Sequence, residues 1–172
     1  MNNSEFYIGQ VFNGQYSPYA AVWCNKNNAY IIKEDGKFII KAIPEPSLEE
    51  LKEQKIKQID KETSELILSG FDYTINDIEY HFSYDSFDQQ NFADTANMCQ
   101  LALSGVEGLP TTVTWNSYLE DGTLIQQEFD ANSFLKLYTS GAMVHKATQM
   151  TIGGQRKAAV QLASTKEELD NI

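Results

Sequence analysis

Histidine and cysteine are the side chains best suited to acid–base or nucleophilic chemistry near neutral pH. This chain has two of each: His81, His145, Cys24 and Cys99. They do not cluster in the sequence, and no C-x-x-C, H-E-x-x-H, G-x-S-x-G or phosphate-binding glycine motif occurs. The sequence therefore predicts no catalytic residue, no metal ligand and no cofactor.

Each of these side chains has an ordinary structural interpretation. We expect His81 to face Asp72 across a hairpin rather than to act as a base. His145 has no second ligand four residues further on, which disfavours a metal. Cys99 lies on an apolar helical stripe and is predicted to be a small core residue, and Cys24 is predicted in a strand.

Acidic side chains are the more unusual feature of this 172-residue chain. The net charge is −11, and residues 70–129 contain ten carboxylates without one Lys or Arg. This charge disfavours binding to nucleic-acid phosphates. A solvated surface that maintains solubility and a face that meets a basic partner both remain open. The aspartates do not form a calcium-binding loop, which disfavours a cation site.

The elements that must position these residues begin with a β segment. Runs at 6–8, 19–24, 29–34 and 37–41 are predicted as strands, and Asp35-Gly36 is a strong hairpin-turn signal. Pro44 and Pro46 end the segment, which predicts a small antiparallel β meander over residues 1–46.

A helix is predicted next, because Ser47 and Glu50 form a capping box. Apolar spacing extends to residue 68, and Gly70 ends the pattern. We expect a linking helix over residues 47–69. Ile56, Ile59, Thr63 and Leu66 match two heptads, so the stripe packs on the chain's own core or on another copy.

The most regular pattern is residues 71–82. With Asn76-Asp77 in a two-residue turn, three apolar pairs share one face, and the polar residues share the other. The pairs are Phe71 with Phe82, Tyr73 with Tyr80, and Ile75 with Ile78. This register predicts a half-buried hairpin.

The rest of the chain predicts a second helix, a second hairpin and a long last helix. Helical spacing runs from Ser86 to Leu103, and residues 111–129 flank an Asp121-Gly122 turn. We expect Val113, Trp115, Leu119 and Leu124 on one face of this hairpin and Tyr118, Ile125 and Phe129 on the other. Asp130 caps the last helix, Gly153-Gly154 is predicted to weaken or break it, and a short terminal helix follows Thr165.

No apolar run is long enough to span a membrane, and no secretory signal is expected at the N-terminus. The aromatic residues (nine Tyr, nine Phe, two Trp) suit a core, an interface or a sugar-binding platform, and Trp23 and Trp115 are the candidates for a platform.

The order of several motifs from Pro46 to Ile172 resembles the DUF4376 type of domain of tailed-phage and prophage proteins. The motifs are PSLEELK at 46–52, the hairpin at 71–82, Asp85 with DQQN at 88–91, the Trp115 strand with its Asp121-Gly122 turn, and ASTKEEL at 163–169. The resemblance implies a role in or beside tail-fibre proteins, without known catalysis, and it supplies no functional residues.

Together these features predict an α+β protein: an N-terminal antiparallel β meander, a linking helix, then a helix–hairpin–helix–hairpin–helix domain. The expected parts are a β segment at 1–46, the helix at 47–69 and a DUF4376-like domain at 70–172. The expected function is that of a non-enzymatic structural protein of the phage tail-fibre or baseplate region. A tail-fibre assembly chaperone absent from the virion and a carbohydrate-binding module are the alternatives.

The expected partners are a tail-fibre or baseplate protein and further copies of the chain, with a trimer favoured by analogy to fibres. Nucleic-acid binding and membrane insertion are not expected. The expected location is the virion tail, or the cytoplasm of the infected bacterium during assembly.

Overall fold

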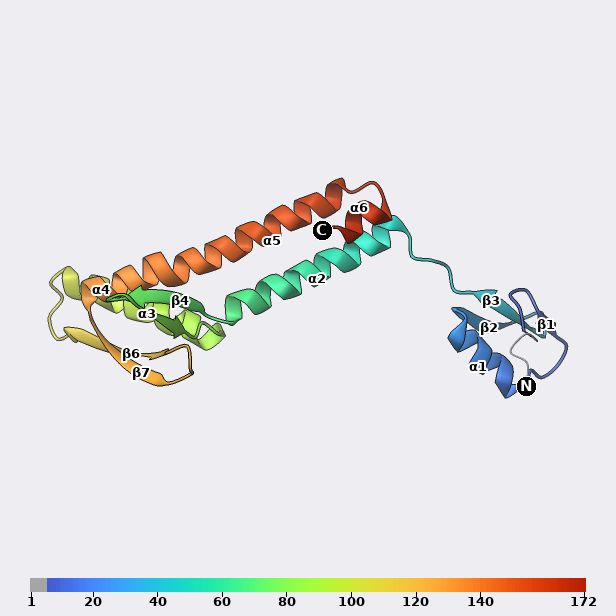
Figure 1. Ribbon diagram of the computed structural model, residues 1–172, viewed down its shortest axis with the longest axis horizontal. Helices are drawn as coiled ribbons and strands as arrows, with labels where there is room; N and C mark the ends of the chain where they lie inside the picture. The colour runs from blue at the N-terminus through green and yellow to red at the C-terminus, as the bar shows by residue number, and fades with distance from the viewer. Residues whose placement is uncertain (1–5) are drawn as a thin grey trace. The chain divides into compact units, whose positions relative to one another are not determined.

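A computed structural model of the chain describes residues 6–172 (Figure 1). The chain divides into two units, which meet in sequence between Ser47 and Leu48. Each unit has its own buried cluster, and each is described by itself.

The first unit contains a three-stranded antiparallel sheet and one helix. Strands β1 (Val11–Phe12), β2 (Ala29–Glu34) and β3 (Lys37–Ala42) are arranged in the order β1-β3-β2. Asp35 and Gly36 both have positive φ in the β2–β3 turn, as the Asp-Gly signal predicts. An antiparallel N-terminal sheet is therefore confirmed.

The strand predicted at 19–24 is wrong, because these residues belong to helix α1 (Pro18–Lys26). Ser17 caps the helix by accepting from the Tyr19 backbone N–H, and Pro18 occupies its first turn. Cys24 belongs to the buried cluster with Ala29 and Ile40, and Ala20, one helical turn earlier, is fully buried. Helical spacing and a Ser-Pro start outweigh the β propensity of the intervening aromatic and branched residues.

The second unit is built on two long helices, α2 (Leu48–Leu68) and α5 (Val144–Leu162). They run side by side in opposite directions (Figure 1). Ile59 of α2 and Val160 of α5 are fully buried between them, together with Leu169 of the short helix α6 (Lys166–Asp170). Ile56 and Ile59 of the partial heptad therefore pack within their own chain, whereas Leu66 is 49% exposed.

A four-stranded antiparallel sheet forms the rest of this unit, with strands in the order β4-β5-β6-β7. The strands are β4 (Phe71–Ile75), β5 (Ile78–Phe82), β6 (Thr112–Tyr118) and β7 (Leu124–Asp130). The β4–β5 register is the one predicted, with Tyr73 opposite Tyr80. One face of the sheet packs against α3 (Ser86–Leu103) and α4 (Ala131–Leu137), and Phe82, Phe92 and Phe134 are the largest fully buried side chains in this core.

The predicted helix–hairpin–helix–hairpin–helix arrangement is wrong in two respects. The two hairpins are not separate, because β5 pairs with β6 at His81 and Tyr118 and joins them into one sheet. The chain after β7 is not one helix: α4 continues through a π-helical turn, η1 (Tyr138–Met143), into α5, and α6 follows.

Local packing explains this difference. Gly141 in the π-helical turn lies against β4, where an added Cβ would come within 2.6 Å of Phe71 Cε2. A periodic apolar pattern does not reveal such a tertiary contact, so the sequence gives no signal for the π turn.

The predicted facing of the second hairpin is also wrong. The register pairs Val113 with Phe129 and Trp115 with Gln127, so Val113, Trp115 and Phe129 share the buried side. Tyr118 and Leu124 pair with each other on the opposite side. The loop around Gly122 is longer than a two-residue turn, and its length sets this register.

Candidate functional site

The open face of the four-stranded sheet is the first candidate site. Alternation along the strands sends most of the apolar residues to α3 and α4 and most of the polar residues outward; Leu124 is an apolar exception on the open face, and Ser117 is a polar exception on the buried face. The outward residues include Asp72 and Thr74 on β4, Glu79 and His81 on β5, Thr114, Asn116 and Tyr118 on β6, and Gln126, Glu128 and Asp130 on β7. Four carboxylates thus lie on one surface without a Lys or Arg among its residues.

The carboxylates of residues 70–129 differ in how firmly they are held. Asp85 caps α3 by accepting from the Phe87 and Asp88 backbone N–H groups, each at 2.8 Å. Asp121 accepts from the Thr123 backbone N–H at 2.9 Å, and hydrogen bonds from the side chain and then the backbone of Thr123 lower the pKa of the carboxyl. These two acids serve local structure. By contrast, Glu79 and Glu128 are exposed on the open face and are free to meet a partner.

The basic side chains of this unit are used elsewhere. Arg156 on α5 donates to Glu62 at 2.7 Å, and Lys157 donates to Asp60 at the same distance, so both hold α5 to α2. The hydrogen bond from Arg156 lowers the pKa of Glu62. The negative field of the sheet is therefore not neutralised by these two cations.

A polar cleft of about 450 Å³ lies between β6 and the start of α3. Its walls come from three segments that are distant in sequence. They are Ser83, Asp88 and Asn91 at the start of α3, Thr114, Trp115, Asn116 and Tyr118 on β6, and Gln126 on β7. Ser83 Oγ donates to Asp88 Oδ2 at 2.6 Å, which fixes one wall. Hydroxyl, amide and carboxylate groups beside an aromatic ring can bind a polyhydroxylated ligand.

The two tryptophans proposed as sugar platforms are both half-buried. Trp115 packs on Phe92, with ring centroids 4.3 Å apart, and on Phe134 at 5.1 Å. Trp23 packs against the buried cluster of the first unit. Trp115 therefore contributes one edge to the cleft while most of its ring stabilises the core.

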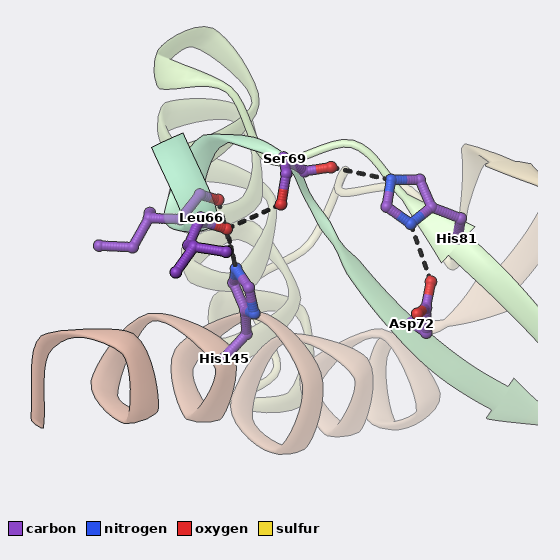
Figure 2. Close-up of polar contacts among 6 residues, drawn as sticks. Leu66, Ser69, Asp72, His81 and His145 are labelled. Atoms are coloured by element: carbon purple, nitrogen blue, oxygen red, sulfur yellow. Dashed lines mark hydrogen bonds and ion pairs between the residues drawn. The ribbon is translucent and has the colours of Figure 1, made fainter. Parts of the chain in front are cut away.

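The side chains of His81 on β5 and His145 on α5 both reach the C-terminal end of α2 (Figure 2). His81 Nε2 donates to the Ser69 carbonyl at 3.0 Å, and its Nδ1 lies 2.8 Å from Asp72 Oδ1. His145 Nε2 lies 3.1 Å from the Leu66 carbonyl. The last carbonyls of a helix lack intrahelical hydrogen-bond donors, and these two imidazole rings donate to them.

The predicted pairing of His81 with Asp72 is therefore confirmed. Both ring nitrogens of His81 face oxygen acceptors, so the ring has no free nitrogen with which to accept a proton from a substrate.

Both cysteines are buried, at 2% and 3% exposure for Cys24 and Cys99, and neither forms a disulfide. Burial raises the pKa of both thiols, which disfavours the reactive thiolate. Within residues 6–172, no group of three or more His, Cys, Asp or Glu side chains could hold a metal ion.

The cleft is the feature that sequence reasoning missed. Its residues come from three segments, and no local motif brings them together. One signal was present: polar residues alternate at Thr112, Thr114 and Asn116, which marks an outward-facing strand side.

Residues 50–172 match a family described as a domain of unknown function, DUF4376. No curated protein and no solved structure matches the chain. No helix within residues 6–172 is long and apolar enough to cross a membrane. The family match covers most of the chain and the whole region that carries the open sheet face and the cleft, so the chain belongs to the DUF4376 family.

Proposed function

We propose that this chain is a non-enzymatic structural component of a phage tail-fibre or baseplate region. It docks a basic surface of another tail protein through the open face of its four-stranded sheet. Membership of the DUF4376 family supports the tail-fibre or baseplate role only because this domain type resembles domains of tail-associated phage proteins.

The observation that carries the docking proposal is the one-signed charge of the open sheet face. Asp72, Glu79, Glu128 and Asp130 lie on it, and the bases Arg156 and Lys157 are held at α2 by Glu62 and Asp60. A surface of one sign attracts a basic partner and disfavours contact with an acidic one.

The test is a double substitution, Glu79→Gln with Glu128→Gln, which removes two charges and preserves side-chain size. The tagged full chain is used to capture partners from a phage lysate at low and high salt, and the partners are identified by mass spectrometry. We expect capture of a basic tail protein that weakens with salt and falls at least severalfold in the variant.

The matched control is Glu53→Gln with Glu167→Gln, which changes the net charge equally at exposed positions outside the sheet. Equal capture by the wild type and both variants, with only solubility reduced, would support the solvated-surface interpretation and reject the docking face.

The cleft between β6 and α3 favours a second candidate function, the binding of a host-surface carbohydrate. Trp115→Ala is an ambiguous test because the ring packs on Phe92 and Phe134. Asn116→Ala and Gln126→Ala remove exposed cleft groups without opening the core. Glycan-array binding that both substitutions abolish would establish this function, and an array without binding by the wild type would reject it.

A further inference from the structure

The junction between α2 and the β4–β5 hairpin is held by the ring of His81 (Figure 2). This side chain stands on β5. Its Nε2 lies 3.0 Å from the carbonyl oxygen of Ser69, directly after α2, and its Nδ1 lies 2.8 Å from Asp72 Oδ1 on β4. One ring therefore connects two strands and the end of a helix.

Both oxygens that face this ring can only accept a hydrogen bond. A backbone carbonyl and an ionised carboxylate carry no proton, and a neutral imidazole has a single N–H. A neutral His81 would therefore leave the lone pair of one nitrogen facing an oxygen at 3.0 Å or less. The imidazolium has an N–H on each nitrogen, so this form donates to Asp72 and to Ser69 at the same time.

His145 offers a comparison at the same helix end. Its Nε2 lies 3.1 Å from the Leu66 carbonyl oxygen and 3.3 Å from that of Ile67. One N–H can be shared between two neighbouring carbonyls, so a neutral ring satisfies this contact. The geometry requires two ring protons at His81 and only one at His145.

The charges that the strands place around His81 favour the imidazolium. Asp72 on β4 and Glu79 on β5 lie on its side of the sheet, and Tyr118 is its neighbour across the pairing with β6. Strands β4, β5 and β6 contain no Lys or Arg. A nearby carboxylate stabilises the charged form of a histidine.

The end of α2 acts in the same direction. Its last carbonyls form the negative end of the helix dipole, which favours a cation beside them. Lys61 on α2 lies 3.7 Å from Glu65, and Lys146 on α5 donates to Gln89 at 2.7 Å. These two cations are engaged with other side chains, so neither competes with the imidazolium.

The backbone beside the ring permits this close contact. Gly70, which follows Ser69, has φ +93°, and an added Cβ would come within 2.6 Å of His81 Nε2. A side chain at position 70 would therefore displace the ring from the end of α2. Glycine supplies both the backbone conformation and the space.

We propose that His81 is a pH-sensitive clamp, whose imidazolium form ties the end of α2 to the β4–β5 hairpin and whose loss of one ring proton releases one of the two contacts. Histidine ordinarily changes charge between about pH 5 and 8. The clamp is closed at the acidic end of this range and half released at the alkaline end. This device does not depend on the proposed tail function.

The first test follows the ring nitrogens of His81 by NMR during a pH titration of the full chain without a histidine tag. The variant His145→Gln assigns the signals, because the chain has two histidines. In Asp72→Asn, we expect His81 to lose its second proton at a pH lower by about one unit. The asparagine amide can donate to a neutral Nδ1, so the variant no longer requires the imidazolium.

The matched control is Asp77→Asn, which removes the same charge from the turn of the same hairpin. Asparagine tolerates the positive φ of 64° at this position. The control should leave the titration of His81 unchanged. No shift in Asp72→Asn, or equal shifts in both variants, would overturn the proposal.

The second test measures the urea midpoints of the wild type and His81→Gln at several pH values between about 5 and 8. The unfolded chain has neither contact, so the folded state binds the ring proton more tightly and the stability from the clamp is lost as pH rises. We expect the advantage of the wild type to fall by about half across this range, because one of the two contacts is released.

His145 and all other titrating groups are present in both proteins, so their contributions cancel in this comparison. An advantage that stays constant with pH, or that grows as pH rises, would show that His81 is a static structural residue and would contradict the clamp.

Discussion

Gly153 of α5 lies directly against Thr63 of α2, so that a Cβ at position 153 would come within 2.4 Å of Thr63 Oγ1. This contact explains the glycine at position 153 inside a helix that runs unbroken from Val144 to Leu162. The prediction that the pair weakens or breaks the helix was wrong, because tertiary packing against α2 outweighs the low helix propensity of glycine.

The first prediction concerns these adjacent glycines. Gly153→Ala should lower the free energy of unfolding by about 1–3 kcal/mol, because the methyl group collides with Thr63. Gly154→Ala should raise it by up to about 1 kcal/mol, since alanine favours the helix and meets no neighbour among the described residues. Urea denaturation measures both.

Thr63→Ala combined with Gly153→Ala tests the cause. If the hydroxyl and methyl of Thr63 cause the collision, the double variant should be more stable than the sum of the single effects predicts. Additive effects would show that a collision with Thr63 is not the cause of the destabilisation by Gly153→Ala.

The second prediction concerns Gly70, which connects α2 to β4. Its φ is +93°, and an added Cβ would come within 2.3 Å of the Phe82 carbonyl oxygen. Gly70→Ala should therefore destabilise the unit by roughly 2 kcal/mol or more, through backbone strain and displacement of β5.

Gly122→Ala is the control for Gly70→Ala, because Gly122 has φ +81° but nothing within 4 Å of its Cβ position among residues 6–172. It should cost about 1 kcal/mol, from the backbone conformation only. Thermal unfolding that ranks the two variants equally would exclude the collision with β5 as a cause.

The third prediction is a loss of stability in acid. The Ser133 backbone N–H donates to Asp130 at 2.7 Å and lowers the pKa of that carboxyl, and Arg156 does the same for Glu62. A carboxyl whose pKa is lower in the folded state stabilises the fold above its unfolded pKa. That stabilisation is lost as pH falls from about 4 through the folded pKa.

Asp130→Asn preserves a hydrogen-bond acceptor at the start of α4 but removes the titrating group. The melting temperature of the wild type should fall more steeply below about pH 4 than that of the variant. Parallel curves would show that Asp130 does not contribute to the acid sensitivity.

The sequence was most informative where one pattern determined the structure. In the β4–β5 hairpin, alternation and the Asn76-Asp77 turn predicted every pair from Phe71–Phe82 to Ile75–Ile78. Both turn residues adopt positive φ, as a tight turn requires. Slipping this register by one residue would expose the aromatic side, so few alternatives existed.

The sequence was least informative where contacts between segments distant in the chain determine the local structure. The helix at Tyr19–Cys24 depends on burial of Ala20 and Cys24, and the π turn depends on contact between Gly141 and Phe71. The polar cleft depends on the approach of β6 and β7 to the start of α3, which no local pattern reports. The acidic character of residues 70–129 was visible in the sequence, but the placement of Glu128 on the same face as Asp72 and Glu79 depends on how the two hairpins join.

The central claim is that this chain is a structural component of a phage tail. Mass spectrometry of purified intact particles, with copy counting against a known tail protein, tests it most directly. If the proposal holds, a phage or an inducible prophage encodes the chain, and the particles are taken from that source. The account predicts that the chain remains in the particle at a fixed copy number through high-salt washing and gradient purification. Its absence from intact particles, with abundance only in the lysate, would contradict the structural role and favour an assembly chaperone.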